Sequence, residues 1–276
     1  MIKKILVVLI VIGLVLLGYM FTVAKRDPVI RADEVTMASW PADQPSIKIL
    51  LVSDVHVAGP DMPPERLQRI VAQINAINPD IVAFAGDFVS DKRIATKRYT
   101  VNEALAPLGN LAPRIGSFAV LGNHDHWRDA NAVAEQLGDA GVTVLSNSAT
   151  EIGPLAFGGI DDDFTNHANV PVVLNEMSKM SGIPVYLSHS PDITPDLPNE
   201  ESIILAGHTH CGQIVLPWFG AFAYMSKYGD RYGCGKITEG RKTIFVSAGL
   251  GTSLLPLRLG AIPDMWLITI GPNLKR

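Results

Sequence analysis

Cysteine and basic charge are both scarce in this sequence, and each shortage excludes a class of protein. The 276 residues include only two cysteines, Cys211 and Cys234, which allow one disulfide but cannot form a disulfide framework. Lysine and arginine number 23 against 27 aspartates and glutamates, for a net charge of −4, and they are dispersed along the chain. A chain without a basic surface is a poor binder of polynucleotides, so we expect no nucleic-acid partner.

We find no internal repeat, and the only low-complexity segment is an apolar run of 19 uncharged residues at 5–23. Its length matches a single membrane-spanning helix, so we interpret residues 1–26 as a signal anchor in the inner (cytoplasmic) membrane. A cleaved signal peptide is the alternative, because Thr22-Val23-Ala24 loosely fits a cleavage site, although the run exceeds the usual length. Lys3-Lys4 before the run and Lys25-Arg26 after it nearly balance, so charge does not decide which side holds the domain.

Residues 27–46 contain three X-Pro dipeptides and are interpreted as a linker, with room for one short edge strand at 35–38. We place one domain at 47–276, since about 250 residues can bury a sizeable core. Residues 47–52 and 79–85 are apolar runs typical of buried strands, and apolar residues at helical spacing lie between them at 63–78. This order predicts a right-handed parallel strand-helix-strand unit.

Further helices are expected at 95–109, broken by Pro107, and at 129–139, where Asp129 can act as the N-cap. After Gly141 the chain changes to short apolar runs separated by Gly, Pro and Asp, which we interpret as a second sheet stacked on the first, with helices outside both. The fold class is therefore α/β. The short runs lie at 142–145, 149–152, 155–160, 183–187, 203–205, 213–216, 236–238, 243–247 and 265–270.

Five apolar runs end in side chains that can bind metal, and in open α/β sheets ligands bind at the carboxyl ends of strands. The residues are Asp54 and His56, Asp87, then Asn123, His124 and Asp125, then His189, and finally His208 and His210. Asp54 and His56 would share one side of an extended strand. Gly86 and Gly207 would allow tight turns before Asp87 and His208.

Each motif alone is more typical of a capped turn or a surface residue than of a metal site. The joint pattern is different, because five of the seven histidines lie at strand ends beside Asp or Asn, where polar groups are costly unless paired or metal-bound. His126 and His167 fall outside the pattern. We assign them no role beyond a rim contact for His126.

Together, Asp54-x-His56, Gly86-Asp87-Phe88-Val89-Ser90-Asp91, Gly122-Asn123-His124-Asp125, Ser188-His189 and Gly207-His208-Thr209-His210 resemble the calcineurin-like metallophosphoesterases over residues 47–250. The resemblance implies a four-layer α/β/β/α sandwich and two divalent metal ions, for which Mn²⁺, Fe or Zn²⁺ would suit the ligands. It assigns Asp54, His56 and His210 to one metal, Asn123, His189 and His208 to the other, and Asp87 to both. It also places His124 against the substrate phosphate, with Asp125 holding the His124 ring.

The implied activity is dinuclear-metal-dependent hydrolysis of a phosphoester or pyrophosphate bond. The apolar amino terminus further resembles a bacterial membrane-associated branch of the family. Some members of that branch act on UDP-2,3-diacylglucosamine in the lipid A pathway, so the resemblance allows a lipid-linked substrate for this chain. A protein phosphatase or general phosphodiesterase is the enzymatic alternative, and the charge balance disfavours a nuclease. The non-enzymatic alternative is a membrane-tethered module with structural metals, which does not account for His124.

Two features leave alternatives open. Cys211 follows His210 directly, where the family more readily has Gly; we interpret it as a small buried residue, although a thiol there can bind soft metal or oxidise. Residues 217–232 are rich in aromatics, which we expect to pack onto the second sheet. The other interpretation is an apolar lip for acyl chains, with Lys227 or Arg231 near phosphate.

Overall fold

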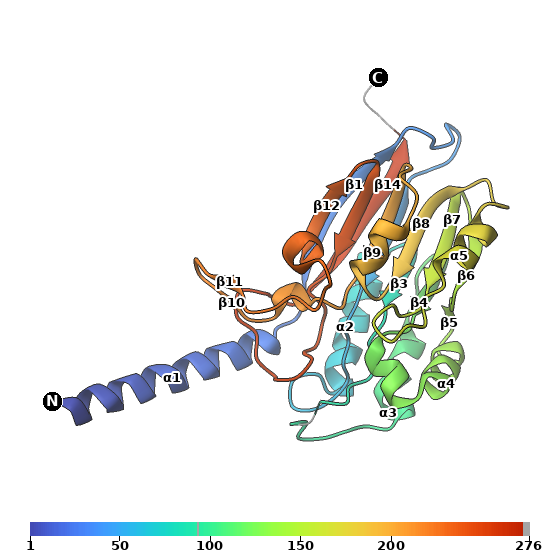
Figure 1. The fold of residues 1–276 in the computed structure, drawn as a ribbon. Coiled ribbons are helices and arrows are strands. Elements are labelled where there is room, and N and C mark those ends of the chain that lie inside the picture. Colours follow the sequence, from blue (N-terminus) through green and yellow to red (C-terminus); the bar gives the residue numbers. More distant parts are fainter. Residues whose placement is uncertain (93, 273–276) are drawn as a thin grey trace.

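Parallel strands joined by helices build two six-stranded sheets that face each other (Figure 1). The structure is a computed structural model, and it describes residues 1–92 and 94–272; the last four residues of the expected domain, 273–276, lie outside this range. The first sheet has the strand order β1 (Val29–Met37), β14 (Asp264–Pro272), β2 (Ile47–Val52), β3 (Ile81–Ala85), β4 (Gly116–Val120) and β5 (Val142–Val144). The second has the order β12 (Gly235–Glu239), β13 (Lys242–Val246), β9 (Ser202–Ala206), β8 (Ile183–Ser188), β7 (Leu155–Ile160) and β6 (Ser148–Ile152).

Helices cover the outer faces of both sheets, which confirms the four-layer sandwich. The helices α2 (Pro64–Ile77), α3 (Val101–Leu105) and α4 (Asn123–Asp139) pack on the first sheet, and α5 (Val170–Met177) packs on the second. Side chains such as Leu51 and Phe157 fill the space between the sheets. Because both faces of β2, β3 and β9 are largely buried, these strands are apolar in sequence except for Lys48 in β2 and Ser202 in β9.

Two strands lie in a different sheet from the one we expected. β5 and β14 follow Gly141 in the sequence, yet both belong to the first sheet, where β14 pairs antiparallel with β2 and parallel with β1. Partners more than 200 positions apart, such as Ile49 and Ile268, cannot be inferred from local periodicity.

The segment expected to be a linker is largely part of the fold. β1 spans nine residues and forms the edge of the first sheet, whereas we expected a short strand at 35–38 at most. Residue 47 is therefore too late a boundary for the folded domain. The X-Pro dipeptides lie on either side of β1 and do not interrupt it, because a proline is tolerated outside a ladder.

The helices differ from expectation at their ends. The expected helix at 95–109 is shorter, since α3 begins after Thr100, whose hydroxyl caps the Glu103 N–H, and a 3-10 turn, η1 (Ala106–Asn110), follows it. α4 begins six residues earlier than expected and bends at Asp129, whose carboxylate accepts a hydrogen bond from the Ala132 N–H at 3.1 Å. α5 was not predicted. Its valine-rich sequence favours a strand, but the Asn169 side chain caps it.

The amino-terminal helix α1 (Ile2–Ala24) is the one helix among the described residues that is long and apolar enough to cross a membrane. It projects away from the sandwich, and only its last turns touch the domain (Figure 1). A small hairpin of β10 (Val215–Leu216) and β11 (Gly220–Ala221) stands outside both sheets on the same side of the domain (Figure 1).

Candidate metal centre

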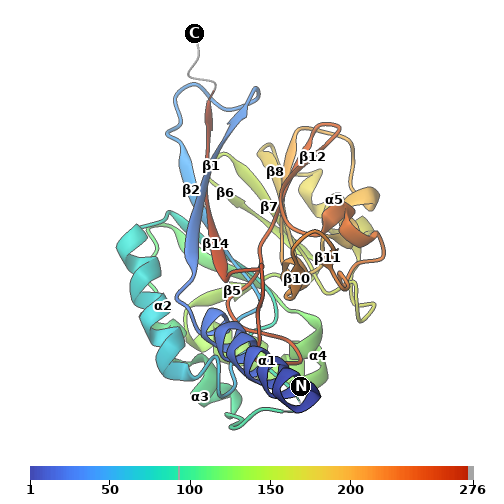
Figure 2. The same cartoon turned by 90° about the vertical axis from the view of Figure 1, so that its left-hand side faces the viewer.

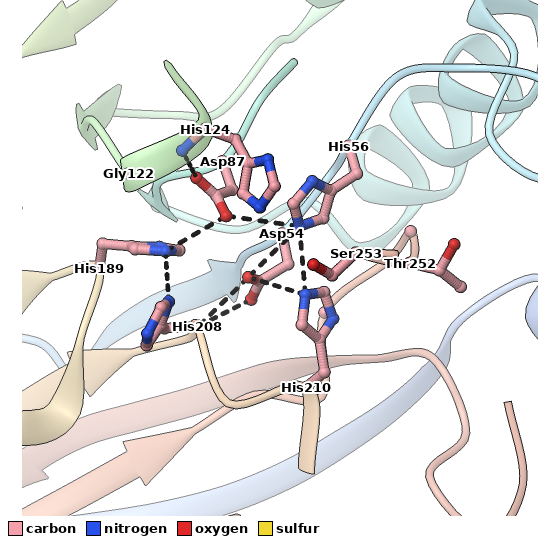
Figure 3. A network of polar contacts seen from close by, with 12 residues as sticks. Asp54, His56, Asp87, Gly122, His124, His189, His208, His210, Thr252 and Ser253 are labelled. Carbon is pink, nitrogen blue, oxygen red and sulfur yellow. Dashed lines mark hydrogen bonds and ion pairs between the residues drawn. The ribbon is translucent and has the colours of Figure 1, made fainter. Parts of the chain in front are cut away.

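The loops after β2, β3, β4, β8 and β9 meet between the two sheets, and they bring all seven expected metal ligands into one buried cluster. Figure 3 labels all of these residues except Asn123. The seven are Asp54, His56, Asp87, Asn123, His189, His208 and His210. Each is 5% exposed or less. The carboxyl ends of parallel strands from both sheets therefore lie together and place these polar side chains at one site, which is where open α/β sheets bind ligands.

The ligands expected for the first metal lie together. His56 Nε2 is 3.1 Å from His210 Nε2, and Asp54 Oδ1 is 3.5 Å from His210 Nε2 and 3.9 Å from His56 Nε2. The donor atoms of this group fall within 4.8 Å of one another, which is the spacing of atoms around a single cation.

The ligands expected for the second metal also meet. His189 Nε2 lies 3.0 Å from Asn123 Oδ1 and 3.0 Å from His208 Nδ1. The remaining ring nitrogen of His189 donates to the Ala85 carbonyl at 2.8 Å, which fixes the ring and leaves Nε2 free to face the cluster.

Asp87 lies between the two groups. Its Oδ2 atom is 3.4 Å from His56 Nε2 on one side and 3.3 Å from His189 Nε2 on the other, while Oδ1 accepts a hydrogen bond from the His124 N–H at 2.8 Å. One carboxylate oxygen shared by two imidazole groups is the arrangement that a bridging ligand needs.

The backbone at these ligands departs from what we expected. Asp54, His56 and Asp87 have φ values of 49°, 49° and 58°, and His208 and His210 have 67° and 50°. The prediction that Asp54 and His56 share one side of an extended strand is therefore wrong, because both lie beyond β2 in the left-handed region. Such conformations cost free energy in non-glycine residues and concentrate at functional sites.

Two glycines allow the loops to approach this closely. Gly86 has a φ of +77°, so it makes the turn before Asp87, as expected. Gly207 acts differently, since a Cβ there would lie 2.5 Å from the Asp54 carboxylate. Its role is to let the His208 loop pack on Asp54 rather than to supply a left-handed turn.

Burial keeps three of the imidazoles neutral. It lowers the pKa of His56 and His210 well below the ordinary value and lowers that of His208 to about 3. His189 differs: burial opposes its protonation, but the charge of Asp87 raises the pKa of His189 well above the usual range. Burial likewise opposes ionisation of Asp87, yet the neighbouring histidines, His189 first, lower the Asp87 pKa. Three neutral imidazoles and an ionised carboxylate are thus in the state that metal binding requires, and His189 would release its proton when a cation binds.

The hydrogen bonding of the histidine side chains in this cluster also indicates that it can hold cations. The His56 and His210 Nε2 atoms lie 3.1 Å apart, and in two neutral rings they present lone pairs to each other unless a proton or a cation lies between them. The buried His208 Nε2 atom also finds no partner among the residues that the structure describes. Imidazole, carboxylate and amide donors suit Mn²⁺, Fe or Zn²⁺, and all seven ligands are in place to hold them.

His124 faces the same cluster from α4, and its orienting carboxylate is not the one we expected. Asp91, not Asp125, contacts His124 Nδ1. Asp125 instead accepts hydrogen bonds from the backbone N–H groups of Phe88, Val89 and Gly122, and burial raises its pKa to about 7. Asp125 thus joins the first turn of α4 to the Asp87 loop. Asp91 and Asp125 both lie in the sequence motifs, so only the direction of their side chains in the structure shows which of them contacts His124.

His124 is also close enough to belong to the cluster itself. Donor atoms of His56, Asp87 and His124 lie within 4.8 Å of one another. The ring is 7% exposed and forms part of a pocket wall, whereas His56 is fully buried. This position suits a group that faces a substrate.

A largely apolar pocket of about 350 Å³ adjoins the cluster. Only some of the residues that line this pocket were identified from the sequence. Its floor includes Asp87, His208 and His210. Its walls are made by Trp127, Phe164, Phe222, Met225, Leu254 and Leu255. Trp127 and Phe164 were missed because each is a single aromatic beside polar residues, and nothing in the local pattern links them.

The aromatic segment 217–232 does not pack onto the second sheet as a whole. Tyr232 is fully buried, but Trp218, Phe219 and Phe222 are 99%, 86% and 78% exposed. The two basic side chains of the segment do not line the pocket. Lys227 forms an ion pair with Asp163 at 2.7 Å, and Arg231 forms one with Glu239 at 2.6 Å. The expectation that one of them lies near phosphate is not supported by these contacts.

Cys211 is not a free thiol. It is buried, as we expected, and it is bonded to Cys234, so it carries no thiol that could bind a soft metal. The sequence allows this pair but does not require it, because two cysteines 23 positions apart form a disulfide only when the fold brings their Cα atoms within reach.

His126 lies at the edge of the site and outside the ligand cluster, as expected. Its Nε2 atom is 2.8 Å from Asp161 Oδ1, and its ring stacks on His167 with the centroids 3.9 Å apart. Ser146 donates to the other oxygen of Asp161 at 2.6 Å. This group connects α4 to the loop after β7.

The fold and the site together define a metallophosphoesterase. The chain belongs to the calcineurin-like phosphoesterase family, whose model matches residues 47–212. Members of this family use divalent metals, and the candidate ligands lie within or beside the matched range.

Relatives of known sequence agree with this placement. The chain is 32% identical over 230 residues to an uncharacterized metallophosphoesterase of Aquifex aeolicus, covering 81% of this chain and 85% of that protein. It is 31% identical over 233 residues to the uncharacterized metallophosphoesterase YkuE of Bacillus subtilis, covering 81% and 78%. A transmembrane protein with metallophosphoesterase domain from Danio rerio is 28% identical over 96% of this chain, which spans 62% of that protein's length.

Proposed function

We propose that this protein hydrolyses a phosphoester or pyrophosphate bond at a dinuclear metal centre. The position of Asp87 is the observation that carries the proposal, because one carboxylate oxygen lies within 3.4 Å of an imidazole from each half of the cluster. Asp54, His56 and His210 would hold one cation, and Asn123, His189 and His208 the other. Such a pair of cations, when bound, supplies a nucleophilic hydroxide near neutral pH and offsets charge on the phosphate oxygens.

His124 is the group of this chain that we assign to the reacting phosphate. It forms part of the pocket wall beside Asp87, and its Nδ1 atom is in contact with Asp91. A carboxylate that accepts from one ring nitrogen orients the ring, so His124 in its protonated form can donate the proton of its other nitrogen to the leaving oxygen. Asp91 acts through His124 and is a positioning residue.

For the substrate, we propose a lipid-linked phosphoester or pyrophosphate, with UDP-2,3-diacylglucosamine as one candidate. The apolar walls of the 350 Å³ pocket support this, because a soluble, fully charged substrate would gain nothing from Phe164, Phe222 or Leu254. α1 supports it as well, since an enzyme that is held at a membrane meets its lipids there. We propose accordingly that the chain is a single-pass protein of the inner membrane.

The dinuclear centre is tested by metal analysis of the full chain in detergent, together with its rate on a chromogenic phosphodiester in Mn²⁺. We expect Asp87→Asn to lose both metal content and activity, because it weakens a ligand common to both cations. The matched control is Asp139→Asn, an exposed aspartate at the end of α4. Wild-type metal content and rate in Asp87→Asn would overturn the proposal.

The substrate class is tested separately with a panel of lipid-linked pyrophosphates, soluble phosphodiesters and phosphomonoesters. We expect the ratio of kcat/KM to favour the lipid-linked members, because their acyl chains can fill the apolar pocket. Phe164→Ser should reduce that ratio while it leaves the rate on a small phosphodiester largely intact. Equal kcat/KM for lipid-linked and soluble substrates would exclude the lipid assignment but not the hydrolytic centre.

A further inference from the structure

The membrane helix is built into the domain rather than loosely tethered to it. Met20, Val23 and Ala24 in its last turns are buried against the sandwich. The backbone N–H of Arg258 donates to the Met20 carbonyl at 3.1 Å. Just beyond the helix, the fully buried guanidinium of Arg66 donates to the Arg26 carbonyl. Contacts of this kind fix the direction in which α1 leaves the domain.

This junction sets the height of the domain above the bilayer. Residues 2–19 are nearly all exposed, whereas burial begins at Met20. Eighteen helical residues rise about 27 Å, close to the hydrocarbon thickness of roughly 30 Å. A bilayer crossed by residues 2–19 would therefore have its surface where Met20 meets Arg258, with the loop around Arg258 at the level of the lipid headgroups.

Large apolar side chains are exposed at this junction. Trp218, Phe219 and Phe222 belong to the β10–β11 hairpin, and Leu254 and Leu255, which are 70% and 43% exposed, belong to the loop that precedes Arg258. We call these five residues the apolar rim. The hairpin projects to the same side of the domain as α1 (Figures 1 and 2). Contiguous exposed apolar residues of this size mark a contact surface.

The two parts of the rim are held together as one unit. The Gln213 side-chain amide donates to the Leu255 carbonyl at 3.1 Å, and the Val215 N–H donates to the Leu259 carbonyl at 2.7 Å. Since the loop leads directly into Arg258, which bonds to α1, the hairpin is connected to the membrane helix through a short, continuous set of hydrogen bonds.

We propose that the apolar rim lies in the surface of the lipid bilayer beside α1, as a second membrane contact of this chain. Tryptophan and phenylalanine favour this interfacial region, and Lys25 and Arg26 at the end of α1 can meet lipid phosphates there. Phe222, Leu254 and Leu255 also line the pocket, so its opening adjoins the lipid. If the proposed function holds, an amphiphilic substrate enters the metal centre from the bilayer and not from water.

Tryptophan emission tests the contact without any reference to catalysis. The chain has four tryptophans, of which Trp40 and Trp266 are buried and Trp127 lies in the pocket wall. The full chain is reconstituted into nanodiscs made from lipids with brominated or ordinary acyl chains, since bromine quenches only nearby indoles. We expect brominated lipid to quench the wild type and Trp218→Phe to lose most of that quenching. Trp127→Phe is the matched control and should retain it.

The outcomes are distinct. Undiminished quenching in Trp218→Phe, or emission from Trp218 that aqueous iodide quenches as readily as in free tryptophan, would overturn the proposal. A second variant, Trp218→Ser with Phe219→Ser, leaves the pocket lining intact. It should keep the wild-type rate on a soluble phosphodiester and turn over vesicle-borne substrate more slowly. A chain without phosphodiesterase activity would refute the proposed function but would not change the quenching result.

Discussion

His124 differs from the other histidines of the centre in its partners. The ligand histidines face one another or Asp87, whereas His124 is paired with the carboxylate of Asp91 and lies in the pocket wall. An imidazole that is held by a carboxylate and opens to a pocket is arranged for proton transfer. Its function can be separated from metal binding by substitution.

We expect His124→Ala to lower kcat on a phosphodiester by about 10² to 10⁴-fold, the usual contribution of a general acid. Asp91→Asn should lower kcat by about 10 to 100-fold, because it removes the group that orients the ring. Both variants should keep the metal content of the wild type. Metal loss in His124→Ala would instead make His124 a ligand, and an unchanged rate in Asp91→Asn would remove its positioning role. Partial recovery in Asp91→Glu would confirm that role.

His126 predicts a pH dependence of stability. The hydrogen bond that His126 donates to the Asp161 carboxylate raises the pKa of His126 above its ordinary value, so the folded state favours the charged ring. That stability is fully present below the unfolded pKa of about 6.5 and is lost as pH rises through the higher folded value. His126→Gln should therefore destabilise the protein more at about pH 6 than at about pH 8.5. Urea unfolding at both pH values measures the difference. A destabilisation independent of pH would show that charge makes no contribution.

At the scale of elements, the disulfide joins the short turn η3 (His210–Gly212) to the chain just after η4 (Gly229–Tyr232). The hairpin that carries Trp218 lies between the two cysteines. This hairpin has few strand contacts of its own, so the bond holds the rim segment next to the metal ligand His210. Closing a loop of this length stabilises a fold by about 3 kcal/mol in the chain-entropy account.

The disulfide also predicts the redox environment of the domain, because disulfides persist in oxidising compartments. We expect the chain from cells that are lysed directly into a maleimide-polyethylene glycol reagent to take up no label, and to take up two after reduction. The count is clear because the chain has only two cysteines. Such a result would place the domain on the oxidising side of the membrane. Two labels without reduction would place it on the reducing side.

At the scale of the whole molecule, α1 has two parts with different roles. Its exposed part supplies the length that a bilayer needs, and its last turns complete the packing around Arg66 and Arg258. The end of the helix is therefore a structural part of the phosphoesterase domain. A domain boundary drawn at the end of the apolar run would remove it.

Two truncations test this division. Removal of residues 2–19 should leave the unfolding midpoint in urea nearly unchanged. Removal of residues 2–26 should lower stability by about 3 kcal/mol or more, because it uncovers apolar surface and leaves buried donors of Arg66 and Arg258 without partners. Equal stability of the two proteins would show that the junction contributes nothing.

The sequence alone was sufficient for much of the fold. Runs such as 203–205 and 155–160 are apolar throughout and agree with the observed strands β9 and β7. α5 was missed because its valines favour a strand, and the helix depends on the Asn169 cap and on packing against β6 and β7. Local pattern therefore identified elements whose burial is uniform, and it failed where packing overrides propensity.

The type and order of the candidate ligands could be predicted from the sequence, because each lies within a few residues of a buried strand end and needs no distant partner to be recognised. Only the tertiary contacts established which sheet holds β14, that Asp91 and not Asp125 meets His124, and that Cys211 bonds to Cys234. Those features depend on side-chain direction and on contacts between segments far apart in the chain. Periodicity and spacing carry no information about either.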